Sequence, residues 1–172
     1  VDVAEPRRSS STHVRLKALT EGSRWVVLIG PRVEAFHGEW LPALLEQVGR
    51  SGVAAASPKL LHPNGARAWA GADVGSASLW LEHAVHDVTE LCAACIAVPR
   101  ELVVSAEVPL DLAARAEFLS EQCAGWRKAG SRLIFTPFSV LYVHGANGEL
   151  EASAPKLPGA SRRKRIRSSI RS

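Results

Sequence analysis

Two cysteines separated by two residues, Cys92-Ala-Ala-Cys95, have the spacing most readily associated with chemistry in this chain of 172 residues. Such a pair is typical of a redox motif or of half a zinc site. A zinc site needs two further ligands, and no second pair follows; His83 and His86 lie nearby but in a different pattern. Because free Cys packs as a small hydrophobe, we interpret both residues as buried thiols of a reduced, intracellular protein.

A basic run near the end of the sequence is the second candidate for chemistry. Residues 162–172 hold six of the 21 basic residues and none of the 17 acidic ones, so the remaining 15 basic residues leave the body slightly acidic. The candidate anion-binding residues of this tail are Arg162, Arg163, Lys164, Arg165 and Arg167. Such a polycation contacts an anionic membrane surface, an acidic protein or nucleic acid, or is only a solvated terminus. Nucleic acid is the least favoured partner, because the body lacks a basic groove with interleaved aromatic residues.

Composition narrows the class of protein. A chain of this length that is 47% hydrophobic can bury the core of one domain. Its longest apolar runs have the length of strands rather than of membrane-spanning helices. It contains no G-x-S-x-G, no H-E-x-x-H and no Gly-rich phosphate loop. We therefore expect a cytoplasmic protein, with peripheral attachment to a membrane through the tail as an option.

The pattern of apolar residues predicts an α/β domain with a mixed, mostly parallel sheet flanked by helices. We expect a flexible lead-in over residues 1–12, this domain over 13–150 and a disordered basic tail over 151–172. In chain order, the expected elements are a helix over 13–20, a strand over 25–29, a helix over 40–48, a strand over 52–61, a turn and returning strand over 62–69, a strand over 88–98, a helix over 112–129, and strands over 132–135 and 140–143.

Five segments in this order resemble the second half of a family 2 glycosyltransferase domain of the GT-A fold. They are VVLIGPRVE at 26–34, the Trp-Leu helix at 40–48, GVAAASPKLLHPNGARAWAG at 52–71, LCAACIAVPRE at 91–101 and EQCAGWRKAGSRLIFTPFSVLYVH at 121–144. The resemblance implies a truncated GT-A domain. It also implies a relationship to enzymes that move a sugar from a nucleotide-sugar donor to an acceptor hydroxyl.

The resemblance also implies a donor-binding site, with one departure from the family pattern. Where the family carries an acidic metal ligand at the end of the first matched strand, this chain has Arg32. A guanidinium cannot ligate a cation but can contact a diphosphate. Glu34, two residues on, remains acidic and is either a cation ligand or a solvated loop carboxylate. A divalent cation, Mn²⁺ or Mg²⁺, is implied only where the donor site is functional.

The family's general base and its last histidine have partial counterparts. Glu121 is the nearest match to the base that removes the acceptor proton, although the first acid of that element is replaced by Leu119. Glu117, one helical turn earlier, is an alternative, and a plain helix-surface glutamate is the simpler reading. His144 matches the last histidine of the family, which lies near the metal or diphosphate, whereas Val143 replaces the histidine before it.

The strands that grip the donor nucleoside in the family have no counterpart here, since barely two dozen residues precede the first matched strand. A sheet without those strands exposes an edge that must be covered or paired. The resemblance therefore predicts another chain or domain that completes the sheet, and activity that is impaired or absent in this chain alone. The alternative is a non-catalytic scaffold or interaction subunit with a basic, anion-binding tail.

Overall fold

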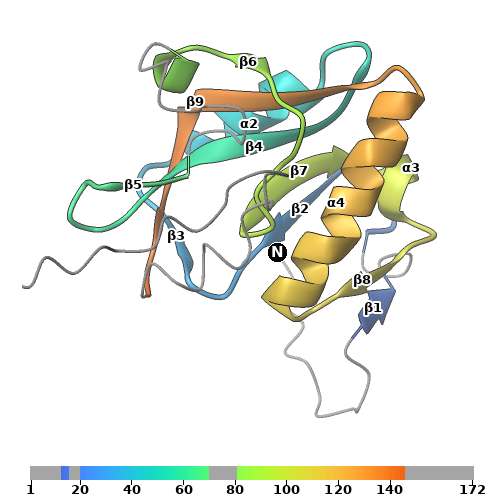
Figure 1. Ribbon diagram of the computed structural model, residues 1–172, viewed down its shortest axis with the longest axis horizontal. Helices are drawn as coiled ribbons and strands as arrows, with labels where there is room; N and C mark the ends of the chain where they lie inside the picture. The colour runs from blue at the N-terminus through green and yellow to red at the C-terminus, as the bar shows by residue number, and fades with distance from the viewer. Residues whose placement is uncertain (1–12, 16–19, 70–80, 146–172) are drawn as a thin grey trace, which may run out of the picture.

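A computed structural model of the protein describes residues 13–15, 20–69 and 81–145. The lead-in expected over 1–12 and the basic tail expected over 151–172 lie outside these residues. The elements are β1 (His13–Arg15), β2 (Trp25–Ile29), β3 (Val33–Ala35), α2 (Trp40–Val48), β4 (Val53–Leu61), β5 (Arg67–Trp69), η1 (Leu81–His83), β6 (His86–Asp87), β7 (Cys95–Pro99), α3 (Arg100–Val103), β8 (Glu107–Pro109), α4 (Leu112–Lys128) and β9 (Arg132–Val143) (Figure 1).

The main sheet has seven strands and is mixed, which confirms the α/β prediction. Its strand order is β2-β7-β4-β9-β3, with β5 added to β4 and β6 added to β9, while β1 and β8 form a separate two-stranded sheet. Only β4 and β9 are parallel, and every other pair among the described strands is antiparallel. The expectation of a mostly parallel sheet is therefore wrong. Apolar runs suggest a parallel sheet because parallel strands are usually buried on both faces. Here helices cover both faces of the sheet, so its strands are buried whether they run parallel or antiparallel.

The sheet curls into a barrel-like shape because consecutive strands pair at its opposite ends. After β2 ends at Ile29, only residues 30–32 intervene before β3, yet β2 pairs with β7 and β3 pairs with β9. Strand β9 is also interrupted along its length: its register with β4 steps from Pro58↔Thr136 to Lys59↔Val140, which leaves residues 137–139 without partners in β4. Such bulges bend a strand and increase its twist. The bend in β9 lets its last residues meet β3.

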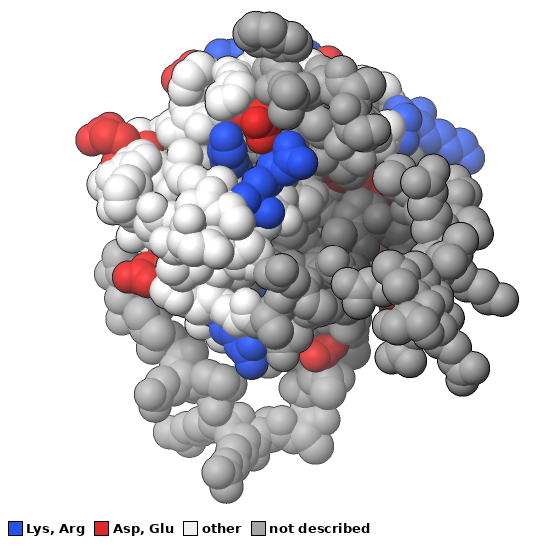
Figure 2. All heavy atoms as spheres, turned by 60° about the vertical axis from the view of Figure 1, so that its left-hand side comes forward, with Lys and Arg blue, Asp and Glu red and all other residues white. Residues whose placement is uncertain are grey.

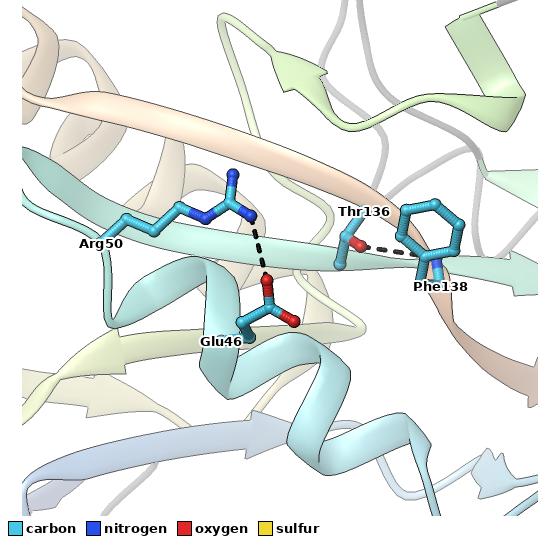
Figure 3. A network of polar contacts seen from close by, with 4 residues as sticks. All are labelled: Glu46, Arg50, Thr136 and Phe138. Atoms are coloured by element: carbon cyan, nitrogen blue, oxygen red, sulfur yellow. Dashed lines mark hydrogen bonds and ion pairs between the residues drawn. The ribbon is translucent and has the colours of Figure 1, made fainter.

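Helices cover the two faces of this sheet. In Figure 1, α2 lies behind β4 and β9, and α4 stands in front at the right. Helix α2 buries Leu44 and Val48, whereas the exposed Glu46 on its outer side forms an ion pair with Arg50, two residues past the end of the helix (Figure 3). Helix α4 buries a stripe at helical spacing that includes Leu119, Cys123 and Trp126. Between the two helices, every residue of β7 is buried.

Local signals predicted the most regular elements well. Helices α2 and α4 occupy the predicted segments, and Gly130 adopts a φ of 82° just after α4, as the C-terminal signal indicates. The predicted turn at residues 62–65 is also confirmed: the amide of Gly65 donates to the carbonyl of His62 (2.8 Å), and the φ of Gly65 is 80°. Strand β5 returns from that turn and pairs with β4.

Three predicted elements differ from the structure. Residues 13–15 form strand β1 rather than the start of a helix, because they pair with β8. The strand predicted over 88–98 is confined to Cys95–Pro99, and the preceding residues form an irregular segment whose Leu91, Cys92, Ala93 and Ala94 are nevertheless buried. The two strands predicted over 132–135 and 140–143 are one strand, β9, with the bulge between them.

Candidate functional site

The candidate site lies where β3 meets the end of β9. In this antiparallel pair, Val33 lies opposite Val143 and Glu34 lies opposite Tyr142. The amide of His144 donates to the carbonyl of Arg32 (2.9 Å), which extends the ladder by one residue beyond the strands. The curl of the sheet thus brings His144 beside Arg32 and Glu34, although His144 follows Glu34 by 110 residues in the chain.

Glu34 and His144 contact each other directly. The imidazole Nε2 of His144 lies 2.6 Å from Oε2 of Glu34, and because an ionised carboxylate only accepts, the imidazole donates. The side chain of His144 is 50% exposed and that of Glu34 is 66% exposed. The pair is therefore open to solvent and to a ligand. In a two-stranded antiparallel ribbon this is a diagonal contact on one face.

An aromatic pair that sequence reasoning missed occupies the same face of this ribbon. Residues alternate between the faces of a strand, so Glu34 and Phe36 share a face with Tyr142 and His144. The rings of Phe36 and Tyr142 meet edge to face, with centroids 5.0 Å apart, yet Phe36 is 61% exposed. The only signal for this pair in the sequence is that Glu34 and Phe36 are two residues apart, as residues on one face of a strand are. That spacing indicates a shared site only once the pairing of β3 with β9 is known. The face combines an acid, an imidazole and an exposed aromatic ring.

Glu121 does not join this group among the described residues. It is exposed on α4, and none of its described hydrogen bonds or ion pairs reaches Glu34 or His144. Helix α4 stands at the right of the molecule in Figure 1, whereas β3 lies at the lower left. Leu119, which replaces the family's acid, is only 1% exposed and is part of the core. Glu117, the alternative base, is likewise exposed on α4, and no described hydrogen bond or ion pair joins it to Glu34 or His144.

The cluster by itself is an incomplete cation site. No group of three or more His, Cys, Asp or Glu side chains that could hold a metal ion occurs within residues 13–15, 20–69 and 81–145. Glu34 and His144 supply one carboxylate and one imidazole. Mg²⁺ is commonly held through one or two carboxylates together with substrate phosphates and water. The residues thus fit a cation that arrives with a diphosphate, and they do not fit a cation bound by protein alone.

The cysteines behave as packed thiols. Cys92, Cys95 and Cys123 are all free and buried. Burial raises the pKa of the Cys95 thiol, and the neighbouring Cys92 raises it further. Burial likewise raises the pKa of Cys123, to about 12. Since metal ligation and redox exchange both require the thiolate, this environment disfavours both chemistries.

The surface of the described body carries basic and acidic groups together. On the face shown in Figure 2, basic side chains gather beside an acidic one amid uncharged surface. Glu82 is an example of an acidic group among basic ones: it accepts a hydrogen bond from Arg67 (3.0 Å) and is attracted by the positive charge of Lys59. Among the described helices, none has both the length and the apolar character needed to cross a membrane.

The comparisons with known proteins give no family for this chain. No protein-family model, no curated protein and no solved structure matches it.

Proposed function

We propose that this chain is a glycosyltransferase-like domain, related to enzymes that move a sugar from a nucleotide-sugar donor to an acceptor hydroxyl, and impaired or inactive by itself. The observation that carries the proposal is the contact of Glu34 with His144 beside the backbone of Arg32. These are three positions that the resemblance assigns to the donor diphosphate. Because His144 follows Glu34 by 110 residues in the sequence, it is the fold that brings their side chains together.

The chemistry of the cluster suits a diphosphate better than it suits catalysis. Arg32 offers a guanidinium whose geometry matches phosphate oxygens, and the imidazole of His144 donates to an anion when protonated. Glu34 would hold Mn²⁺ or Mg²⁺ that enters with the diphosphate; when bound, that cation neutralises charge on the leaving group. The exposed ring of Phe36 provides a surface against which a flat or apolar part of the donor can pack.

A specific observation favours the alternative of a non-catalytic scaffold or interaction subunit. The position of the family's catalytic acid holds Leu119, which is buried, and the nearest carboxylate, Glu121, is exposed on α4. Glu117 is exposed on the same helix, and no described contact links either carboxylate to Glu34 or His144. In this reading the domain keeps the fold, and its partners are the chain or domain that completes the sheet and an anionic surface bound by the tail. A cytoplasmic location, at the membrane periphery, suits either reading.

Calorimetric titration with UDP and with GDP, each with and without Mn²⁺, tests the proposal. We expect metal-dependent binding in the micromolar range. The substitution His144→Ala should weaken it by about tenfold, the effect of losing one charge-assisted hydrogen bond. Arg50→Ala is the matched control, because Arg50 lies just past the end of α2 in an exposed ion pair with Glu46. Absence of binding to both nucleotides would reject a donor site and leave the scaffold as the function.

A further inference from the structure

Strand β2 has a partner on only one side among the described residues. It lies at one end of the sheet order and pairs with β7 alone. The amide of Gly30 donates to the carbonyl of Ala94 (2.7 Å), and the amide of Arg100 donates to the carbonyl of Arg24 (3.1 Å). Backbone groups alternate in direction along an antiparallel strand, so the even-numbered residues of β2 face β7. The N–H and C=O groups of Trp25, Val27 and Ile29 therefore point away from the sheet.

Strand β2 itself carries none of the residues or bulges that protect natural edge strands. Proteins guard such edges with charged residues, prolines, bulges or a covering element. The sequence of β2, Trp-Val-Val-Leu-Ile, contains no charge and no proline, and its register with β7 is unbroken. Ile29 is 42% exposed, and Trp25, Val27 and Leu28 are half-buried. The composition is that of an interior strand with neighbours on both sides.

No stretch of the sequence outside the described residues has the apolar, β-type composition of β2. Residues 1–12, 16–19, 70–80 and 146–172 are rich in Ala, Ser, Gly and charged residues, and none contains a run of five apolar, β-type residues. Unpaired backbone donors and acceptors call for an extended polypeptide rather than for a helix or a small ligand. We infer that the outer edge of β2 is a docking edge for an apolar β-strand from another chain or domain, which pairs with Trp25, Val27 and Ile29.

A tethered strand tests the inference directly. A short repeat of Val and Thr, joined ahead of the full chain by a Gly-Ser linker of about 20 residues, would reach the edge at an effective concentration near the millimolar range. We expect the melting temperature to rise by about 3 °C or more, and amide hydrogen exchange at Val27 and Ile29 to slow by at least about tenfold. The same tether with a Gly-Ser sequence in place of the strand should give neither effect.

Substitutions at Val27 identify the edge. Val27→Pro removes an N–H group that points outward and breaks no hydrogen bond to β7. Since proline is tolerated on free edges, the variant should fold, but the tethered strand should no longer raise its melting temperature. Val27→Thr keeps the N–H and nearly the same shape, and it should retain the gain. Where Val27→Pro fails to fold, Ile29→Lys serves instead, because charge on an edge opposes pairing.

Two results would overturn the inference. One is a tethered protein with unchanged melting temperature and unchanged exchange at Val27 and Ile29. The other is an edge already protected in the untethered chain. Protection that grows with protein concentration would show that a second copy covers β2, and protection independent of concentration would show that a segment of the same chain covers it. All of these measurements are made without nucleotide, so they stand or fall separately from the proposed donor site.

Discussion

The contact of Glu34 with His144 joins two side chains that solvent still reaches, and this decides what it can do for the protein. An exposed ion pair contributes less than about 1 kcal/mol to stability, because water screens the charges and two side chains lose freedom. The contact therefore contributes little to the stability of the fold. Its value lies in holding an acid and an imidazole at a fixed separation of 2.6 Å beside the Arg32 backbone.

The buried thiols give a prediction at the scale of residues. Burial raises the pKa of Cys123 from 9.0 to about 12 and raises that of Cys95 as well. The native protein should therefore react with iodoacetamide at pH 8 at least about 100-fold more slowly than the protein unfolded in guanidinium chloride, since only the thiolate attacks. Because the thiols ionise more readily in the unfolded chain, their contribution to stability is complete below pH 9 and is lost as the pH rises toward 12.

Mass spectrometry after timed alkylation measures these rates, and a urea titration at pH 8 and at pH 10 measures the stability. The midpoint should be lower at pH 10. Rapid alkylation of native Cys92 and Cys95, or binding of one zinc ion per chain, would contradict the assignment of packed thiols and restore the alternative of a metal half-site.

Helix α4 begins at a cap that the structure defines and that gives a prediction at the scale of elements. The carboxylate Oδ2 of Asp111 accepts a hydrogen bond from the amide of Ala114 (2.9 Å), which satisfies one of the free donors of the first turn. Asp111→Ala should lower the free energy of unfolding by about 1 kcal/mol, measured by urea denaturation. Asp111→Asn keeps an acceptor oxygen and should cost no more than a few tenths of that amount. Equal losses in the two variants would show that charge, not the cap, stabilises the helix.

Elements could be predicted from the sequence in proportion to their length and regularity. Helices α2 and α4 repeat apolar residues over several turns, so local pattern alone locates them. Strand β1 is three residues long and depends on β8 for its conformation, which no local pattern records. The apolar composition of the stretch before Cys95 predicts a strand; its residues are buried, but burial alone does not set the backbone conformation. The bulge in β9 was read as a strand end because Thr136-Pro137 is typical of one.

At the scale of the whole molecule, the candidate site depends on the way the sheet curls. The sequence pointed to Arg32, Glu34 and His144 separately, through resemblance, and the pairing of β3 with β9 then brings them together. No local pattern predicts this, because it follows from the three-residue link between β2 and β3 and from the bend in β9. The exposed ring of Phe36 was missed for the same reason. The resemblance alone points to Glu121, which is exposed on α4 with no described contact to Glu34 or His144.

The distribution of charge over the whole molecule gives the last prediction. Six basic residues stand in 162–172, and without them the 17 acidic residues outnumber the basic ones. Each basic residue near an anionic bilayer contributes about 1 kcal/mol at low salt, and the attraction fades over a Debye length of about 10 Å at 0.1 M salt. The full chain should therefore bind vesicles that contain phosphatidylserine at low salt, and deletion of residues 162–172 should weaken binding at least about 100-fold. Co-sedimentation across a salt series measures this, with neutral vesicles as the control. A deletion variant that binds as well as the full chain would move the anion-binding surface from the tail to the folded body, where the charges are mixed.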